Sequence, residues 1–137
     1  MRRIQLAWLT LALSTACGGS PTNDNGNNDN NNPYPQDPGG TPEQAVVVEV
    51  RDNVFVPNSV VVAVGGTVTF RWIGTNGHSV TPRGASTFSP TAPVSYPPKD
   101  LVVAFSSAGT YHYNCIIHGA SDGYGSQGNM IGTVSVR

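Results

Sequence analysis

Four residues of this sequence have side chains that together could hold a metal ion. In the stretch HYNCIIHGASDGYGSQGNM, which runs from 112 to 130, Cys115 is followed after two residues by His118, and Met130 comes twelve residues after that histidine. His78 lies far away in the sequence, behind the stretch WIGTNG. Two imidazoles and a thiolate in a trigonal plane, with a distant thioether as a further ligand, form a copper centre suited to electron transfer. These residue types therefore predict a site for one copper ion.

The spacing of these residues fits a single site. Cys115 is expected to end a strand, and the short gap to His118 lets the chain turn so that both side chains reach one ion. Met130 would open the last strand and close the loop, with Gln127 as an alternative axial ligand through its oxygen, whereas folding must bring in His78. Taken singly, such residues are more often a buried thiol, a solvated histidine and a core methionine. Their combination indicates the metal site, and zinc would also be accepted by these ligands.

The N-terminal part of the sequence has the features of an export signal followed by a linker. Residues 1–16 have a basic start and a mostly apolar core, and small residues lead into Cys17 in an order that resembles a bacterial lipoprotein signal. Cleavage before Cys17 would leave a lipid-bearing cysteine, whereas ordinary cleavage near Ala16 would leave no anchor. Residues 17–44 are rich in Asn, Gly and Pro, which predicts a disordered tether. Residues 45–137 are then expected to form one domain.

Cysteine usage and charge restrict the possible functions. If Cys17 is acylated or removed, Cys115 has no disulfide partner, and a lone exported cysteine is a reactive thiol, an intermolecular bridge or a metal ligand. The formal net charge of −1 gives no reason to expect nucleic acid as a partner. No stretch after the first twenty residues is long and apolar enough to span a bilayer. No general base or nucleophile in an open catalytic position is apparent, so the sequence does not indicate an enzyme.

The domain is expected to be an all-β, Greek-key β-sandwich, because short β-branched runs alternate with Gly- and Pro-rich turns. Val68, Phe70 and Trp72 alternate with polar residues, so one face of their strand is apolar. Residues 82–99 hold five prolines and are expected to be a surface crossover. The predicted strands are 45–50, 54–72 with turns at Pro57-Asn58 and at Gly65-Gly66, 101–106, 109–115 and 130–136.

Three stretches of the sequence resemble the cupredoxins, the type 1 or blue copper proteins, and are closest in pattern to plastocyanin and pseudoazurin. AGTYHYNCIIHG is similar to the family's Gly-x-Tyr-x-aromatic-x-Cys-x-x-His run, MIGTVSV to its closing Met-x-Gly-x-Val-x-Val, and FRWIGTNGHSV to the strand and loop that carry its first histidine. The resemblance covers about residues 45–137. It implies that His78, Cys115 and His118 are equatorial ligands of one copper ion and that Met130 is the axial ligand.

The resemblance further implies a monomer that carries single electrons between redox partner proteins. The N-terminal sequence adds that it would be exported to the periplasmic or cell-surface side of a membrane, to which Cys17 would anchor it. The sequence departs from the plastocyanin pattern in its long ligand loop, where eleven residues separate His118 from Met130. It also has Ile116 where the family often has a hydroxyl that links the two ligand loops. Two alternatives stay open, namely a copper-binding or copper-delivery module without fast electron transfer and an interaction domain with a decayed site.

Overall fold

The computed structural model describes residues 32–89, 92–119 and 130–137. The chain divides into two units, and all described residues belong to the second, which covers residues 31–137. The predicted signal peptide, Cys17 and Gln127 lie outside the described residues. Among the described residues, no helix is long and apolar enough to cross a membrane.

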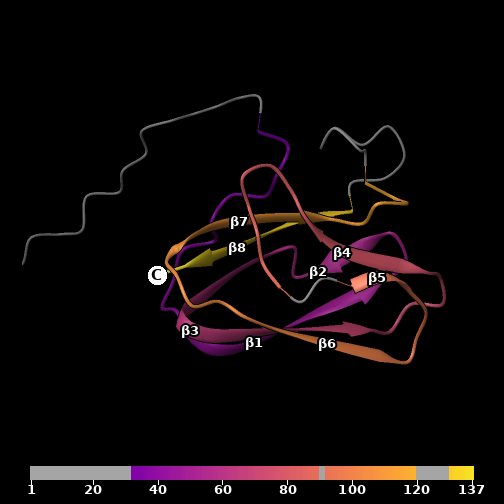
Figure 1. The fold of residues 1–137 in the computed structure, drawn as a ribbon, viewed down its shortest axis with the longest axis horizontal. Coiled ribbons are helices and arrows are strands. Elements are labelled where there is room, and N and C mark those ends of the chain that lie inside the picture. The colour runs from indigo at the N-terminus through magenta and orange to yellow at the C-terminus, as the bar shows by residue number, and fades with distance from the viewer. Residues whose placement is uncertain (1–31, 90–91, 120–129) are drawn as a thin grey trace, which may run out of the picture. The chain divides into compact units, whose positions relative to one another are not determined.

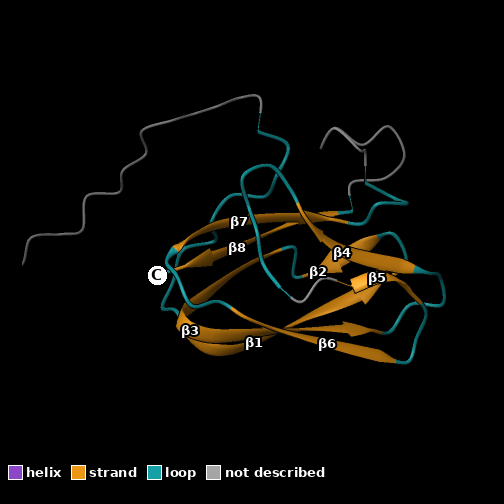
Figure 2. Ribbon diagram, viewed as in Figure 1, coloured by secondary structure: helices purple, strands orange, loops and turns teal. Residues whose placement is uncertain are grey.

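The described part of the second unit is built from strands and loops (Figure 2). The strands are β1 (Glu43–Arg51), β2 (Val54–Val56), β3 (Ser59–Trp72), β4 (His78–Pro82), β5 (Ala92–Ser95), β6 (Lys99–Ala104), β7 (Gly109–Asn114) and β8 (Ile131–Val136). They follow the order β2-β1-β3-β8-β7-β4-β5, and β6 pairs with β3. Figure 1 shows β7 and β8 on one side and β1, β3 and β6 on the other. The prediction of an all-β sandwich is confirmed.

Strand β3 connects the two layers. It is one continuous strand, whereas the sequence analysis predicted two strands separated by a turn. The residues Ser59 to Val62 pair with β8, whereas residues 67–72 pair with β1 and β6. Gly65 and Gly66 were expected to form a turn between two strands, but they form a bend within one. Gly65 has a positive φ of 84°, and its backbone N–H donates to Phe105 O at 2.8 Å. Phe105 N–H in turn donates to Gly66 O, so two hydrogen bonds with Phe105 hold the bend in place.

The crossover predicted for 82–99 contains one short strand, β5, at the edge of the sheet. The register of β5 against β4 places Ser95 opposite His78 and Ala92 opposite Val80. An edge position fits the proline-rich sequence, because proline cannot donate a hydrogen bond to a neighbouring strand. Strand β4, which the strand prediction did not include, begins at His78 and brings this residue to the end of β7.

The core lies between the layers and is rich in valine and aromatic side chains. Val68, Phe70 and Trp72 are buried, as their alternation predicted. The ring of Tyr113 makes edge-to-face contacts with Phe55 at 4.8 Å and with Phe70 at 5.1 Å between ring centroids. Full burial of each such side chain stabilises the fold by about 1.5–3 kcal/mol. This cluster fixes the end of β7, from which the chain continues to Cys115.

Residues 32–42 precede β1 and form a strap against the domain, which differs from the expectation of a disordered tether up to residue 44. The backbone oxygen of Gln36 accepts a hydrogen bond from Ser59 Oγ at 2.7 Å. Arg137 at the end of the chain pairs with Asp37 at 2.8 Å and donates to the backbone oxygen of Gly40 at 2.9 Å. The low hydrophobicity of this segment concealed these contacts, because they are polar and depend on residues distant in sequence.

The strap also covers His112. The ring of Tyr34 stacks on the imidazole with 4.4 Å between ring centroids. Burial lowers the pKa of His112 below its ordinary value of 6.5. The unfolded chain therefore binds a proton more readily than the folded one, and the free energy of unfolding falls as the pH drops below about 6.5.

Replacing Tyr34 with alanine is expected to raise the pKa of His112 toward its ordinary value, because the imidazole then contacts water. An NMR titration of the His112 ring protons measures this shift, and the stability loss at acidic pH becomes smaller. Tyr96→Ala serves as the control, since that tyrosine is 68 % exposed at another place on the domain. An unchanged His112 pKa in Tyr34→Ala would show that the strap does not shield the ring.

Candidate metal centre

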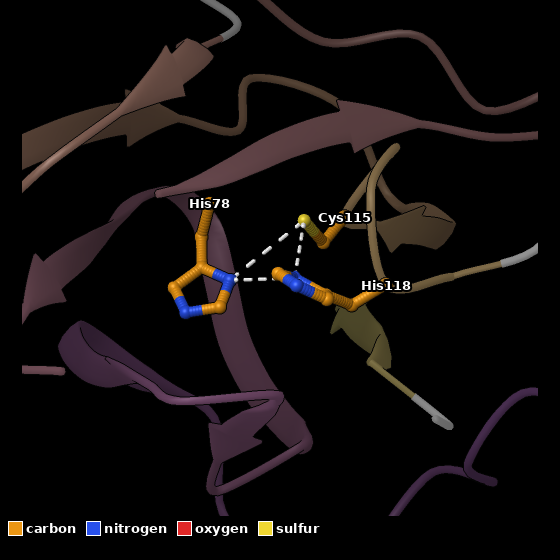
Figure 3. Close-up of side chains that lie close together, drawn as sticks. All are labelled: His78, Cys115 and His118. Atoms are coloured by element: carbon orange, nitrogen blue, oxygen red, sulfur yellow. Dashed lines mark hydrogen bonds between the residues drawn. The ribbon is translucent and has the colours of Figure 1, made fainter. Parts of the chain in front are cut away.

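The structure brings three of the predicted ligands together. His78 Nδ1 lies 3.0 Å from His118 Nδ1, and Cys115 Sγ lies 3.9 Å from the first nitrogen and 3.6 Å from the second. Figure 3 shows the two ring nitrogens and the sulfur turned toward a common point. Within the part of the chain that the structure describes, these three residues form the cluster of potential ligands that could hold a metal ion.

The distances among these three atoms fit one metal ion. Bonds of about 2.0 Å to histidine nitrogen and about 2.3 Å to thiolate sulfur are usual for zinc. In a trigonal plane, such bonds place the two nitrogens roughly 3.5 Å apart and each nitrogen roughly 3.7 Å from the sulfur. The two observed N···S distances, 3.6 and 3.9 Å, lie on either side of this value. The nitrogens, at 3.0 Å, need to separate only slightly. The donor set of two imidazoles and a thiol suits copper or zinc.

A tight turn after β7 places Cys115 and His118 side by side. The strand ends at Asn114, and Gly119 N–H donates to Cys115 O at 2.7 Å, which closes the turn around the two isoleucines. A side chain at Gly119 would meet Cys115 O at 2.8 Å and the Asn114 side chain at 2.9 Å. The absence of a Cβ at this position therefore lets the chain fold back closely enough for His118 to face the sulfur.

Met130 lies directly before β8 and is fully buried in the same core cluster as Cys115. Its backbone oxygen accepts a hydrogen bond from Cys115 N–H at 3.0 Å. The start of the last strand is thereby fixed beside the end of β7. The axial role of Met130 stays a prediction, and its alternative, Gln127, lies outside the described residues.

The surroundings of His78 favour the form that binds metal, and a backbone contact holds the sulfur of Cys115. His78 is fully buried, and this burial lowers its pKa, an effect partly opposed by the nearby Asp52 carboxylate. A neutral imidazole is the form that offers a lone pair to a metal. The backbone N–H of Ser79 lies 3.4 Å from Cys115 Sγ and donates to it. This contact ties the sulfur to the backbone that follows His78.

Ser79 also joins the two ligand loops, a role that the sequence reading did not assign to it. Its Oγ accepts a hydrogen bond from Ile116 N–H at 2.9 Å and lies 3.1 Å from Thr81 Oγ1. Ile116, directly after the cysteine, has no hydroxyl that could link these loops. The structure supplies that hydroxyl from the residue after His78 instead. A serine beside the first histidine was the available signal.

Replacing Ser79 with alanine is expected to lower the free energy of unfolding by about 1 kcal/mol, because Ile116 N–H loses its partner in a partly buried environment. The backbone contact from Ser79 to the sulfur is retained, so the effect is on the link between the loops. Chemical denaturation of the metal-free protein measures the change. Ser106→Ala on the exposed surface is the control and should stay within about 0.5 kcal/mol of the wild type. Equal stabilities of the two variants would contradict the linking role.

The three ligand side chains differ in their access to solvent. His78 and Cys115 are fully buried, whereas His118 is partly exposed. The two isoleucines next to it, Ile116 and Ile117, are 51 % and 50 % exposed. The site therefore reaches the surface at His118, within apolar surroundings.

Comparison with known proteins places this geometry in a known fold. No family model matches the sequence, and no curated protein matches it. Among solved structures, a reduced Cu(I) form of an amicyanin variant has a TM-score of 0.55 and 24 % identity, covering 71 % of this chain and 86 % of its own.

Two further solved structures are similar over nearly their whole length. An oxidized plastocyanin from Dryopteris crassirhizoma has a TM-score of 0.53 and 25 % identity, covering 66 % of this chain and 99 % of its own. A purple cupredoxin from Nitrosopumilus maritimus has a TM-score of 0.54 and 16 % identity, with coverages of 67 % and 99 %. The described domain of this protein has the cupredoxin fold.

Proposed function

We propose that the protein is an exported, mononuclear type 1 copper protein that carries single electrons between redox partners. The observation that carries this proposal is the convergence of His78, Cys115 and His118, with interatomic distances that fit one metal ion. Copper bound there would supply reversible one-electron chemistry between Cu(I) and Cu(II). Similar solved structures include a reduced Cu(I) form of amicyanin and oxidized forms of amicyanin and plastocyanin, which supports copper over zinc.

The residues around the site would keep its geometry constant in both oxidation states. Ser79 joins the loops of His78 and Cys115, and the backbone of Met130 holds Cys115 from the other side. A site that hardly moves when its charge changes has a low barrier to electron transfer. Met130 as the axial ligand would complete a set of four protein ligands, which leaves no position for a substrate. We therefore propose a carrier and not an enzyme.

His118 is the proposed entry point for electrons. It is the ligand that is partly exposed, and the apolar side chains of Ile116 and Ile117 beside it would exclude water from the contact with a redox partner. Export to the periplasmic or cell-surface side, with a lipid on Cys17, remains part of the proposal on the strength of the N-terminal sequence.

The absorption spectrum of the full chain after loading with Cu(II), before and after ascorbate, tests the function. An intense visible band that disappears on reduction is expected from a bond between Cys115 and Cu(II). Voltammetry should then show a reversible one-electron couple. Met130→Leu tests the axial assignment, because it removes the sulfur and nearly keeps the side-chain volume.

Two other results would argue against an electron carrier. Rapid loss of copper to a chelator, without a reversible couple, would support a copper-delivery module instead. A protein that retains zinc and takes up no copper would contradict the proposal.

A further inference from the structure

The second ring nitrogen of His78 points away from the ligand cluster into a buried environment. Nε2 has no hydrogen-bond partner among the described residues, although the side chain is fully buried. Its polar contact is with Asp52 Oδ1 at 3.5 Å, a few tenths of an ångström beyond the usual N–H···O range of about 2.7–3.2 Å. A buried N–H without an acceptor is unfavourable, so this pair of atoms has a reason to approach.

Asp52 is held in place by the loop that leads to His78. Its Oδ1 accepts hydrogen bonds from the backbone N–H groups of Thr75 and Asn76, each at 2.8 Å, and its Oδ2 accepts one from Thr75 Oγ1 at 3.0 Å. A Cβ at Gly74 would come within 2.5 Å of Oδ1, so the loop approaches the carboxylate as closely as a glycine permits. These donors, above all the backbone N–H of Asn76, lower the pKa of Asp52 and keep it charged. One carboxylate therefore organises residues 73–77 and faces the ligand that follows them.

The chemistry of a ligating histidine gives this contact a function. The nitrogen that binds a metal must be free of its proton, so a neutral His78 that binds through Nδ1 carries its proton on Nε2. Histidine ligands commonly donate this second N–H to a carboxylate, which fixes the tautomer, orients the ring and makes the ligand more basic. We propose that Asp52 is a positioning residue of the metal centre, which receives the Nε2–H of His78 and thereby directs Nδ1 toward Cys115 and His118.

This inference rests on the metal-binding part of the proposed function and is independent of electron transfer. It can be tested first without metal. Long-range ¹H–¹⁵N NMR of the metal-free protein at pH 8 reports which nitrogen of His78 carries the proton. The wild type should show the Nε2–H tautomer, and Asp52→Ala should show a mixture of both. A wild-type His78 with its proton on Nδ1 would overturn the proposal.

Copper affinity provides the second readout, measured by competition with a chelator. Loss of an outer-shell partner typically lowers metal affinity by 10–100-fold, and we expect a decrease of about this size for Asp52→Ala. Asp52→Asn keeps an acceptor oxygen and should fall between that variant and the wild type. An affinity of Asp52→Ala within twofold of the wild type would overturn the proposal.

A control separates positioning from the general effect of charge. Asp100→Asn removes the same charge from an exposed residue that pairs with Arg71 on the outside of the sheet. This variant should leave the His78 tautomer and the copper affinity unchanged, and its reduction potential should shift less than that of Asp52→Asn. Equal shifts of the reduction potential in Asp100→Asn and Asp52→Asn would show that the lost charge alone causes the effect. That result would overturn the positioning role. If the wild type binds no copper, the proposed function fails, and the tautomer of His78 alone decides the role of Asp52.

Discussion

Replacing Cys115 with serine is expected to abolish the visible charge-transfer band of the copper-loaded protein completely. The band requires a thiolate bound to Cu(II), and Cys115 supplies the sulfur that lies 3.6 and 3.9 Å from the two ligand nitrogens. A serine hydroxyl stays protonated at neutral pH and is a poor ligand for Cu(I), which prefers soft sulfur. Copper affinity should fall by more than the roughly 10–100-fold typical of a lost outer-shell partner. Absorption spectroscopy and chelator competition measure the two effects.

The control for this variant uses the second cysteine of the sequence. Cys17→Ser removes the thiol of the predicted lipid-attachment residue and should keep both the band and the affinity. The Cys115 variant is expected to fold, because serine is smaller than cysteine and its hydroxyl can accept the N–H of Ser79 that now contacts the sulfur. A band that persists in Cys115→Ser and disappears in Cys17→Ser would reverse the assignment of the site.

Replacing Gly132 with alanine is expected to cause the largest loss of stability among single-methyl additions to the core. A Cβ at this position would collide with the ring and hydroxyl of Tyr113, with Cε2 at 2.7 Å. Tyr113 is fully buried and packed against Phe55 and Phe70, so its ring has no free space to enter. Overpacking of this kind costs about 1–3 kcal/mol or more. Chemical denaturation of the metal-free protein measures the loss.

Gly77 offers a matched comparison, since a Cβ there would also meet a tyrosine ring. The ring belongs to Tyr96, whose nearest atom would be 2.8 Å away, but Tyr96 is exposed and can turn into solvent. Gly77→Ala should therefore cost much less than Gly132→Ala. In addition, Tyr113→Leu should cost less in the Gly132→Ala background than alone, because the smaller side chain relieves the collision. Strictly additive costs would show that this collision is not the cause.

The sequence predicted those features that depend on nearby residues. Alternation of apolar residues in 67–72 identified the buried face, and the short gap from Cys115 to His118 indicated ligands that a tight turn brings together. The bend at Gly65 could not be distinguished from a turn, because the hydrogen bonds that stabilise it come from Phe105, about forty residues away. A pair of glycines is compatible with either conformation.

The sequence did not reveal the supporting residues of the site, for a related reason. Ser79 and Asp52 look like ordinary polar residues of a strand and a turn until the fold brings them beside Ile116 and His78. His78 was identified by its residue type and then by the resemblance of its surrounding stretch, because its distance in sequence from Cys115 carries no spacing signal. The residue types of the ligands can thus be recognised in a single sequence. The groups that orient the ligands cannot, because their roles depend on contacts between distant segments.

The strap of residues 32–42 determines how the domain would respond to mechanical tension. A pull on the chain before Asn32 acts first on the stacking of Tyr34 and then on the bonds of Gln36, Asp37 and Gly40, before it reaches β1. These contacts follow one another along the pulled chain, so we expect them to break in the order of their residue numbers. Arg137, which receives the load last, is at the opposite end of β8 from the metal ligands. Tension applied before Asn32 would therefore act first on the strap and on the end of β8 that lies away from Met130.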